Sequence, residues 1–141
     1  MAHQTVSPRW DDELVPTTSG RTQAPSSECP VEIALSAISG RWTTLVLRNL
    51  LSGGGQSYSE LAASLPQLSD KVLSERLRAL VTAGLVERTV TTGFPQRTDY
   101  LITPRGEELR PLLIELYRTG QALKESNGSV ERHEVFGSSS H

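Results

Sequence analysis

The stretch of residues 58–100 constrains the fold most strongly, because two helical patterns are followed there by two strand-like ones. Each short helical pattern follows a serine that can cap a helix, Ser59 for the first and Ser69 for the second. Two runs rich in β-branched and aromatic residues come next, joined by a Gly-Phe-Pro turn, which is typical of a β-hairpin. The order predicts a helix, a turn, a second helix and a hairpin, the layout of a winged helix-turn-helix.

The second helix, expected over residues 69–83, has two distinct faces. Leu73, Leu77 and Leu80 fall within about 60° of one another at about 100° per residue, so they predict a face directed to the core. The opposite face carries small polar and charged side chains that could enter a major groove: Lys71, Ser74, Glu75, Arg78 and Thr82. Taken alone, this face would equally suit a helix that is simply exposed to solvent.

Three features favour DNA for this face. Helix N-termini attract phosphate oxygens, which suits Ser69 and the backbone amides that follow it. Arginine or lysine can read guanine, and glutamate can accept a hydrogen bond from cytosine. The hairpin adds polar groups suited to a minor groove or a phosphate. The candidate DNA-binding residues are Ser69, Asp70, Lys71, Ser74, Glu75, Arg78, Gln96 and Arg97.

Further helices are expected on both sides of this stretch. Residues 30–38 form a short helix that is apolar on most sides, and residues 41–51 form another, with Trp42 in the core. Residues 56–58 suffice for a minimal strand. Thr103 and Pro104 begin a last helix with a long leucine stripe. Because Pro111 lies inside that stripe and removes a helical hydrogen bond, we expect a kink or break near Glu107.

Composition divides the 141 residues into a domain with two tails. Residues 1–28 are rich in Pro, Ser and Thr and are expected to be disordered, and residues 126–141 are expected to form a flexible tail. Residues 29–125 carry eleven basic and ten acidic side chains, so the net charge of −2 arises outside this domain. Residues 69–98 contain five basic and three acidic side chains. This local excess of positive charge is too small to indicate DNA binding by itself.

Enzymatic function is not expected. All three histidines, His3, His133 and His141, lie in the predicted tails, so the domain has none for a catalytic pair. The single cysteine excludes an intramolecular disulfide and a cysteine-based zinc site, and no metal or cofactor is expected. With no long apolar run and no apolar region at the N-terminus, we expect no membrane span and no signal peptide, hence a cytoplasmic protein.

The order and spacing of several motifs resemble the HxlR family of winged-helix transcriptional regulators from bacteria and archaea. The matching segments are Cys29-Pro30-Val31, Gly40-Arg41-Trp42, Tyr58-Ser59-Glu60-Leu61, residues 68–78, Gly84-Leu85-Val86, residues 98–103, and Gly106 with the leucine-rich last helix. The resemblance covers roughly residues 29–124. It implies a mostly α-helical fold with a small β-hairpin, a winged helix-turn-helix of the MarR/HxlR kind.

The resemblance also implies a homodimer in which the first and last helices pair across a two-fold axis. The residues assigned to that interface are Val31, Ile38, Leu109, Leu112, Leu113 and Leu116. An independent argument agrees, because a small domain has little internal use for both an apolar helix and a long leucine stripe. Each exposed leucine forgoes about 1.5–3 kcal/mol of burial free energy.

The expected function is a sequence-specific DNA-binding regulator, a repressor or autoregulator, that binds a pseudo-palindromic operator as a homodimer. Its partners are double-stranded DNA and a second copy, together with a small-molecule, oxidant or electrophile effector. Cys29 is either structural or, as the resemblance implies for some members, a redox sensor at a helix start, where thiolate is favoured. The alternative function is a winged-helix adaptor that binds proteins and no DNA.

Overall fold

The computed structural model describes residues 11–14, 16–18, 20 and 24–139, so most of the predicted N-terminal tail lies outside the described residues. The chain divides into one unit that ends at Ile33 and one that begins at Ala34. In the first unit, the backbone N–H of Leu14 donates to the Asp11 oxygen and that of Gly20 to the Thr17 oxygen, and α1 (Pro30–Ala37) begins in this unit. The second unit contains the remaining helices and strands and is described by itself below.

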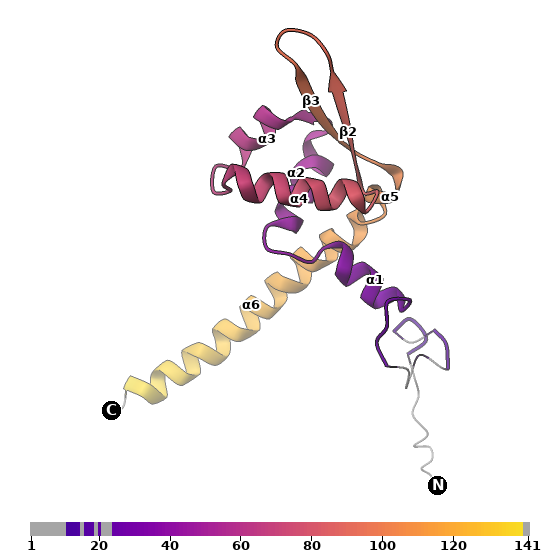
Figure 1. Ribbon diagram of the computed structural model, residues 1–141. Coiled ribbons are helices and arrows are strands. Elements are labelled where there is room, and N and C mark those ends of the chain that lie inside the picture. Colours follow the sequence, from indigo (N-terminus) through magenta and orange to yellow (C-terminus); the bar gives the residue numbers. More distant parts are fainter. Residues whose placement is uncertain (1–10, 15, 19, 21–23, 140–141) are drawn as a thin grey trace. The chain divides into compact units, whose positions relative to one another are not determined.

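Figure 1 shows the elements of the second unit in chain order. They are α2 (Thr43–Gly53), β1 (Gln56–Ser57), α3 (Tyr58–Ser64), α4 (Asp70–Thr82), β2 (Val86–Thr91), β3 (Arg97–Ile102), α5 (Pro104–Glu107) and α6 (Arg110–Ser139). The predicted helix-turn-helix corresponds to α3 and α4, and the predicted hairpin to β2 and β3. The fold is therefore mostly α-helical with a small sheet, as the sequence predicts.

Leucines from α2, α3 and α4 form the core of this unit. The most completely buried side chains include Leu47 and Leu50 of α2, Leu61 of α3, and Leu73 and Leu77 of α4. All three leucines of the predicted inner face of α4 are buried, since Leu80 joins the same cluster. Helices whose apolar stripes meet in this way fix one another, so the polar face of α4 has a rigid support.

The sheet is antiparallel and has the strand order β1-β3-β2. Val86 pairs with Ile102 at the base of the hairpin, and Thr91 pairs with Arg97 at the far end. The two-residue strand β1 adds to the free edge of β3 through Gln56 and Tyr100, as expected for the minimal strand predicted before α3. Because Ser57 is followed directly by α3, β1 connects β3 to the start of that helix.

The starts of three helices are set by side-chain caps. Ser69 caps α4 by accepting from the backbone N–H of Val72, and Thr103 caps α5 by accepting from Gly106, both as predicted. The predicted cap of α3 was wrong by two residues, because Ser57 rather than Ser59 caps it. The Ser57 hydroxyl accepts from the backbone of Glu60 (3.1 Å), and the Glu60 carboxylate accepts from the Ser57 backbone (2.8 Å).

The start of α2 also differs from the prediction. Trp42 adopts a left-handed backbone conformation (φ 78°) before the helix begins at Thr43. Its side chain is half-buried and not part of the buried core, so the predicted core position was wrong. The guanidinium of Arg41 lies over the indole ring, 5.3 Å from its centroid. The left-handed turn places the ring beside Arg41 at the surface instead of in the helix's inward stripe.

The predicted break in the last helix is confirmed. α5 ends at Glu107, and α6 begins at Arg110, which places Pro111 in the first turn, where its missing N–H has no helical partner to lose. α6 is longer than predicted, because it continues beyond residue 125 to Ser139. Polar composition therefore did not end the helix, although the flexibility of residues 126–141 stays a prediction.

Candidate nucleic-acid interface

The polar face of α4 is exposed along its length. Lys71, Ser74, Glu75, Arg78 and Thr82 line one shallow groove together with Ala79 and Ala83. Arg78 forms no ion pair or hydrogen bond with any residue that the structure describes. The predicted face is thus present as a continuous surface, with a free guanidinium near its centre.

Tyr58, which is not among the predicted DNA-binding residues, organises the N-terminal end of this face. The Tyr58 hydroxyl lies 3.2 Å from the Asp70 backbone oxygen, 3.2 Å from its carboxylate and 3.2 Å from the Ser74 hydroxyl. Tyr58 begins α3, twelve positions before Asp70, so this network also connects the two helices of the motif. A long-range bond of this kind has no signal in the local sequence pattern.

The hairpin contributes a second basic side chain beside α4. Arg88 of β2 and Tyr100 of β3 line a groove with Ser74, Arg78 and Thr82. Arg88 is exposed and belongs to a strand in which only the first residue is buried. Strand alternation places Arg88 on the same face of β2 as the buried Val86, so its position toward α4 could have been predicted. The helix and the hairpin therefore present arginines to one shared groove.

Arg97 is the first residue of β3, directly after the turn of the hairpin. Its guanidinium forms an ion pair with Asp99 (2.9 Å) and approaches the Glu60 carboxylate of α3 (3.4 Å). The neighbouring Gln96 lines a separate small groove that includes Tyr58. The contact with Glu60 attaches the hairpin to α3. Because two carboxylates partly neutralise Arg97, it offers DNA less positive charge than Arg88 does.

The Glu60 carboxylate has a pKa below its ordinary value of 4.5. The main cause is the hydrogen bond from the Ser57 backbone N–H, and the positive charge of Arg97 adds to it, while partial desolvation acts in the opposite direction. The ionised form of Glu60 thus stabilises both the start of α3 and the junction with the hairpin.

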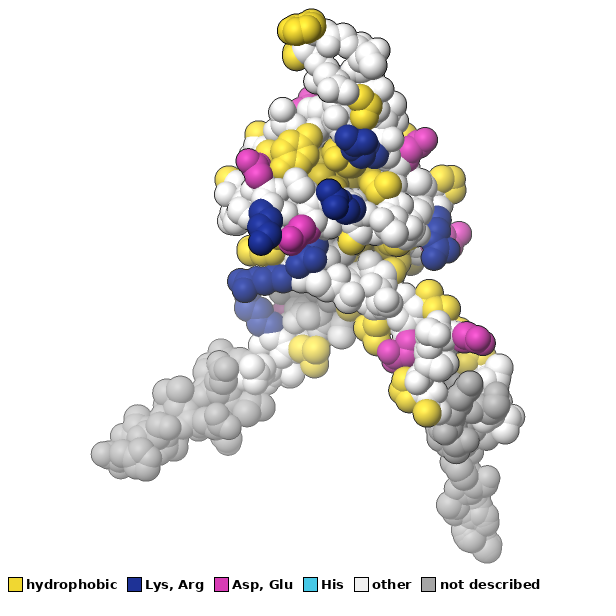
Figure 2. Space-filling model, in the orientation of Figure 1, with side chains coloured by type: hydrophobic (Ala, Val, Ile, Leu, Met, Phe, Trp, Pro, Cys, Tyr) yellow, Lys and Arg dark blue, Asp and Glu magenta, His cyan; other side chains and the backbone are white. Residues whose placement is uncertain are grey.

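Figure 2 shows this side of the molecule, with α4 across the middle and the hairpin above it. Lysine and arginine side chains are spread over α4 and the base of the hairpin, with acidic side chains between them. The surface is mixed in charge, so it lacks the continuous basic stripe of proteins that bind DNA mainly by charge. Affinity for DNA would have to come from a few well-placed contacts.

The predicted interface residues fall into two groups. Leu109 (8% exposed) and Leu113 (5%) are buried in the core of the same chain, and Ile38 and Leu112 pack partly against that core. Leu116 (42% exposed) and Val31 (60%) are exposed. Ile114, Tyr117 and Leu123 of α6 are exposed as well. Leu109 and Leu113 are therefore core residues of this chain, and the exposed residues are the ones most available to another chain.

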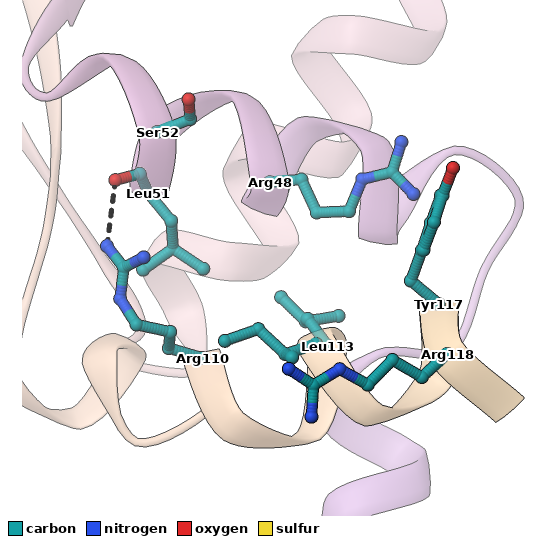
Figure 3. Close-up of a pocket in the computed structure, with 8 residues that line it drawn as sticks. Arg48, Leu51, Ser52, Arg110, Leu113, Tyr117 and Arg118 are labelled. Atoms are coloured by element: carbon teal, nitrogen blue, oxygen red, sulfur yellow. Dashed lines mark hydrogen bonds between the residues drawn. The ribbon is translucent and has the colours of Figure 1, made fainter.

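A groove of about 470 Å³ lies between α2 and α6, away from α4. Figure 3 shows Arg48 extending from α2 toward Tyr117 of α6, with Leu113 beneath. Arg110 donates to the backbone oxygen of Leu51 (3.0 Å) and thereby fastens the start of α6 to the end of α2. The groove is thus an apolar hollow with a rim of arginines.

Cys29 is half-exposed immediately before α1, and its backbone oxygen accepts from Ile33 in the first helical hydrogen bond (2.9 Å). It therefore occupies the helix start that the sequence predicts. Among the described residues, no group of three or more His, Cys, Asp or Glu side chains could bind a metal ion.

A model of the HxlR-like helix-turn-helix family matches residues 37–127. The chain belongs to this family. It is 44% identical over 92 residues to the uncharacterized HTH-type transcriptional regulator YvaP of Bacillus subtilis (strain 168), covering 64% of this chain and 84% of YvaP.

Solved structures resemble the chain as well. The reduced form of the transcriptional regulator YodB from B. subtilis is 32% identical, with a TM-score of 0.57 over 64% of this chain and 88% of that one. The redox regulator HypR in its reduced form is 26% identical, with a TM-score of 0.65 over 72% of this chain and 99% of that one. The chain is thus an HxlR-type member of the HTH transcriptional regulators.

The family match covers the whole helix-turn-helix and the hairpin, so the arrangement of α3, α4, β2 and β3 is that of an HxlR-type regulator. Searching the described portion of the chain finds no helix with the length and apolar character needed to cross a bilayer.

Proposed function

We propose that this HxlR-type protein binds double-stranded DNA sequence-specifically, with α4 in the major groove and the β2–β3 hairpin beside it. The observation that supports this most is the groove shared by Arg78 of α4 and Arg88 of the hairpin. A duplex lying against α4 would meet both guanidiniums at once. The role is regulatory, as repressor or autoregulator, and it places the protein in the cytoplasm with the DNA.

The proposed contacts divide by chemistry. The N-terminal end of α4, with Ser69 and Asp70, approaches a phosphate through its free backbone N–H groups. Arg78 and Lys71 donate to guanine, and Glu75 accepts from cytosine. Ser74, oriented by the Tyr58 hydroxyl, donates to a base or a phosphate. Arg88 joins Gln96 and Arg97 in the contacts that the hairpin makes.

We further propose that the protein is a homodimer that reads a pseudo-palindromic operator. The exposed apolar side chains of α6 support this, because Leu116, Tyr117 and Leu123 remain in water in a single chain. Tyr117 also lines the groove of Figure 3, and we assign this groove to the same interface. Two copies of α4 would then face successive major grooves.

Selection from a library of random-sequence duplexes, followed by hydroxyl-radical footprinting, tests this function. The expected result is an enriched pseudo-palindrome whose two half-sites lie about 10 base pairs, or a multiple of that, apart. Failure to retain any duplex at low salt would contradict the proposal. That result would instead favour the protein-binding adaptor, the alternative function for this fold.

Regulation through Cys29 is a separate proposal. It is the only thiol in the chain, and the similar protein HypR is described as a redox regulator. An oxidant could join Cys29 of two subunits in a disulfide, or an electrophile could modify it, because no second cysteine exists in the same chain. Cys29→Ser should abolish any change in DNA affinity caused by diamide or a quinone. If the affinity of Cys29→Ser still changes with the oxidant, Cys29 does not have this role.

A further inference from the structure

The turn of the hairpin presents an apolar side chain in the open. Phe94 is fully exposed, more so than any other large hydrophobic side chain in the described part of the chain. Even a methyl group added at the neighbouring Gly93 would meet no atom within 4 Å. Exposing a whole aromatic ring forgoes substantial burial free energy, so a ring in this position suits a surface that it meets on binding.

The surroundings of Phe94 favour a duplex as that surface. Between Thr91 and Gln96 the turn has neither acidic nor basic side chains, so no carboxylate at the tip would repel phosphates. Farther down the same hairpin, Arg88 faces the groove that it shares with Arg78 of α4. Figure 1 shows the hairpin extending beyond α3 and α4, so its tip is the part that reaches farthest along a bound duplex.

The reach of the hairpin fits the geometry of B-DNA. Six residue steps separate Arg88 from Phe94, which corresponds to at most about 20 Å of extended chain. Half a helical turn of DNA is about 17 Å, the distance from the centre of a major groove to the next minor groove. With α4 in the major groove, the tip would therefore lie at the flanking minor groove.

We propose that Phe94 is an apolar wedge that inserts between adjacent base pairs from the minor groove and bends the duplex. Aromatic and aliphatic wedges unstack a base step in this way and kink DNA toward the major groove. Pyrimidine–purine steps unstack most easily, so Phe94 would favour such a step at a fixed distance from the bases that α4 reads. The inference rests on the proposed DNA-binding function.

A fluorescent base tests this inference directly. The probe is the duplex that the wild-type protein enriches from a random library, with 2-aminopurine replacing one adenine at a time. Wild-type protein should raise the 2-aminopurine emission severalfold at one step outside each half-site. Phe94→Ala should remove that rise and weaken binding at least about fivefold, as expected for losing one aromatic–base contact. Phe94→Leu should retain part of the rise in emission and part of the affinity, because leucine also serves as a wedge.

Leu101→Ala is the matched control, since Leu101 is half-exposed on β3 of the same hairpin and away from the turn. This variant should give the same rise in 2-aminopurine emission as the wild type. If Phe94→Ala gives the same rise in emission as the wild type, the inference is overturned, whether or not the variant binds more weakly. The proposed DNA-binding function would still stand. If the wild type enriches no duplex, the proposed function and the wedge fail together.

Discussion

At the residue scale, the two arginines of α4 have different roles although they are two positions apart. Arg76 donates from Nε to the backbone oxygen of Arg41 (2.8 Å), so it connects α4 to the segment before α2. Arg78 has no such bond to any described residue and lies in both grooves beside α4. Of the two, only Arg78 is available to a base.

Arg78→Ala should therefore weaken binding to the selected operator by about 1–3 kcal/mol, the usual contribution of a base-reading arginine. Fluorescence anisotropy with the operator and with a scrambled duplex of equal length measures this. An equal loss of affinity for both duplexes would mean that Arg78 contacts a phosphate and does not read a base.

Glu60→Gln should change how stability depends on pH. Glutamine keeps the capping box but loses the charge beside Arg97. Because folding lowers the Glu60 pKa, its ionised form contributes stability above the ordinary pKa of 4.5, and this is lost as pH falls through the lower folded-state pKa. Urea midpoints of wild type and variant should differ at pH 6 and converge as pH falls through the folded-state pKa of Glu60. A pH-independent difference would refute this role.

At the element scale, patterns with a local cause were predictable and those with a tertiary cause were not. The caps Ser69 and Thr103 and the break before Pro111 follow from nearby residues. The Ser57 cap also had a local signal, because serine followed three residues later by Glu60 is the capping-box pattern. The Tyr58 network joins residues twelve and sixteen positions apart, so periodicity gave no indication of it.

At the junction between the hairpin and α5, Gly106 packs closely against its neighbours. A Cβ on Gly106 would overlap the backbone oxygen of Leu85 and approach Ile102 at 3.0 Å. Gly106→Ala should therefore lower the free energy of unfolding by about 1–3 kcal/mol, the usual cost of overpacking.

Gly120→Ala in α6 is the matched control, because its Cβ would meet no atom within 4 Å. That substitution should stabilise the helix by about 0.5–1 kcal/mol. Urea denaturation compares the two, and equal stability of both variants would contradict the described packing.

At the scale of the whole molecule, the long stripe of α6 serves two purposes along its length. Its first part, through Leu113, packs on the core, and its later part, from Ile114 to Leu123, is exposed. The sequence predicted the stripe but not this division, because periodicity identifies the apolar side of a helix without indicating where the body beneath it ends.

Leu116→Asp should dissociate the proposed dimer, because it places a charge among apolar side chains that would otherwise be buried. Sedimentation velocity measures the change. Ala122→Asp introduces the same charge about 120° around the helix at about 100° per residue, and it should leave the dimer intact. A dimer that survives Leu116→Asp would refute the assignment of this face.

The salt dependence of DNA affinity tests the central claim most directly, because α4 and the hairpin are proposed to contact phosphates as well as bases. A dimer with about six phosphate contacts should give a slope of about −5 for log K against log salt. Its affinity for the selected operator should then fall about a thousandfold between about 50 and 200 mM salt. A flat line, or no binding at the lowest salt, would contradict DNA recognition by this surface.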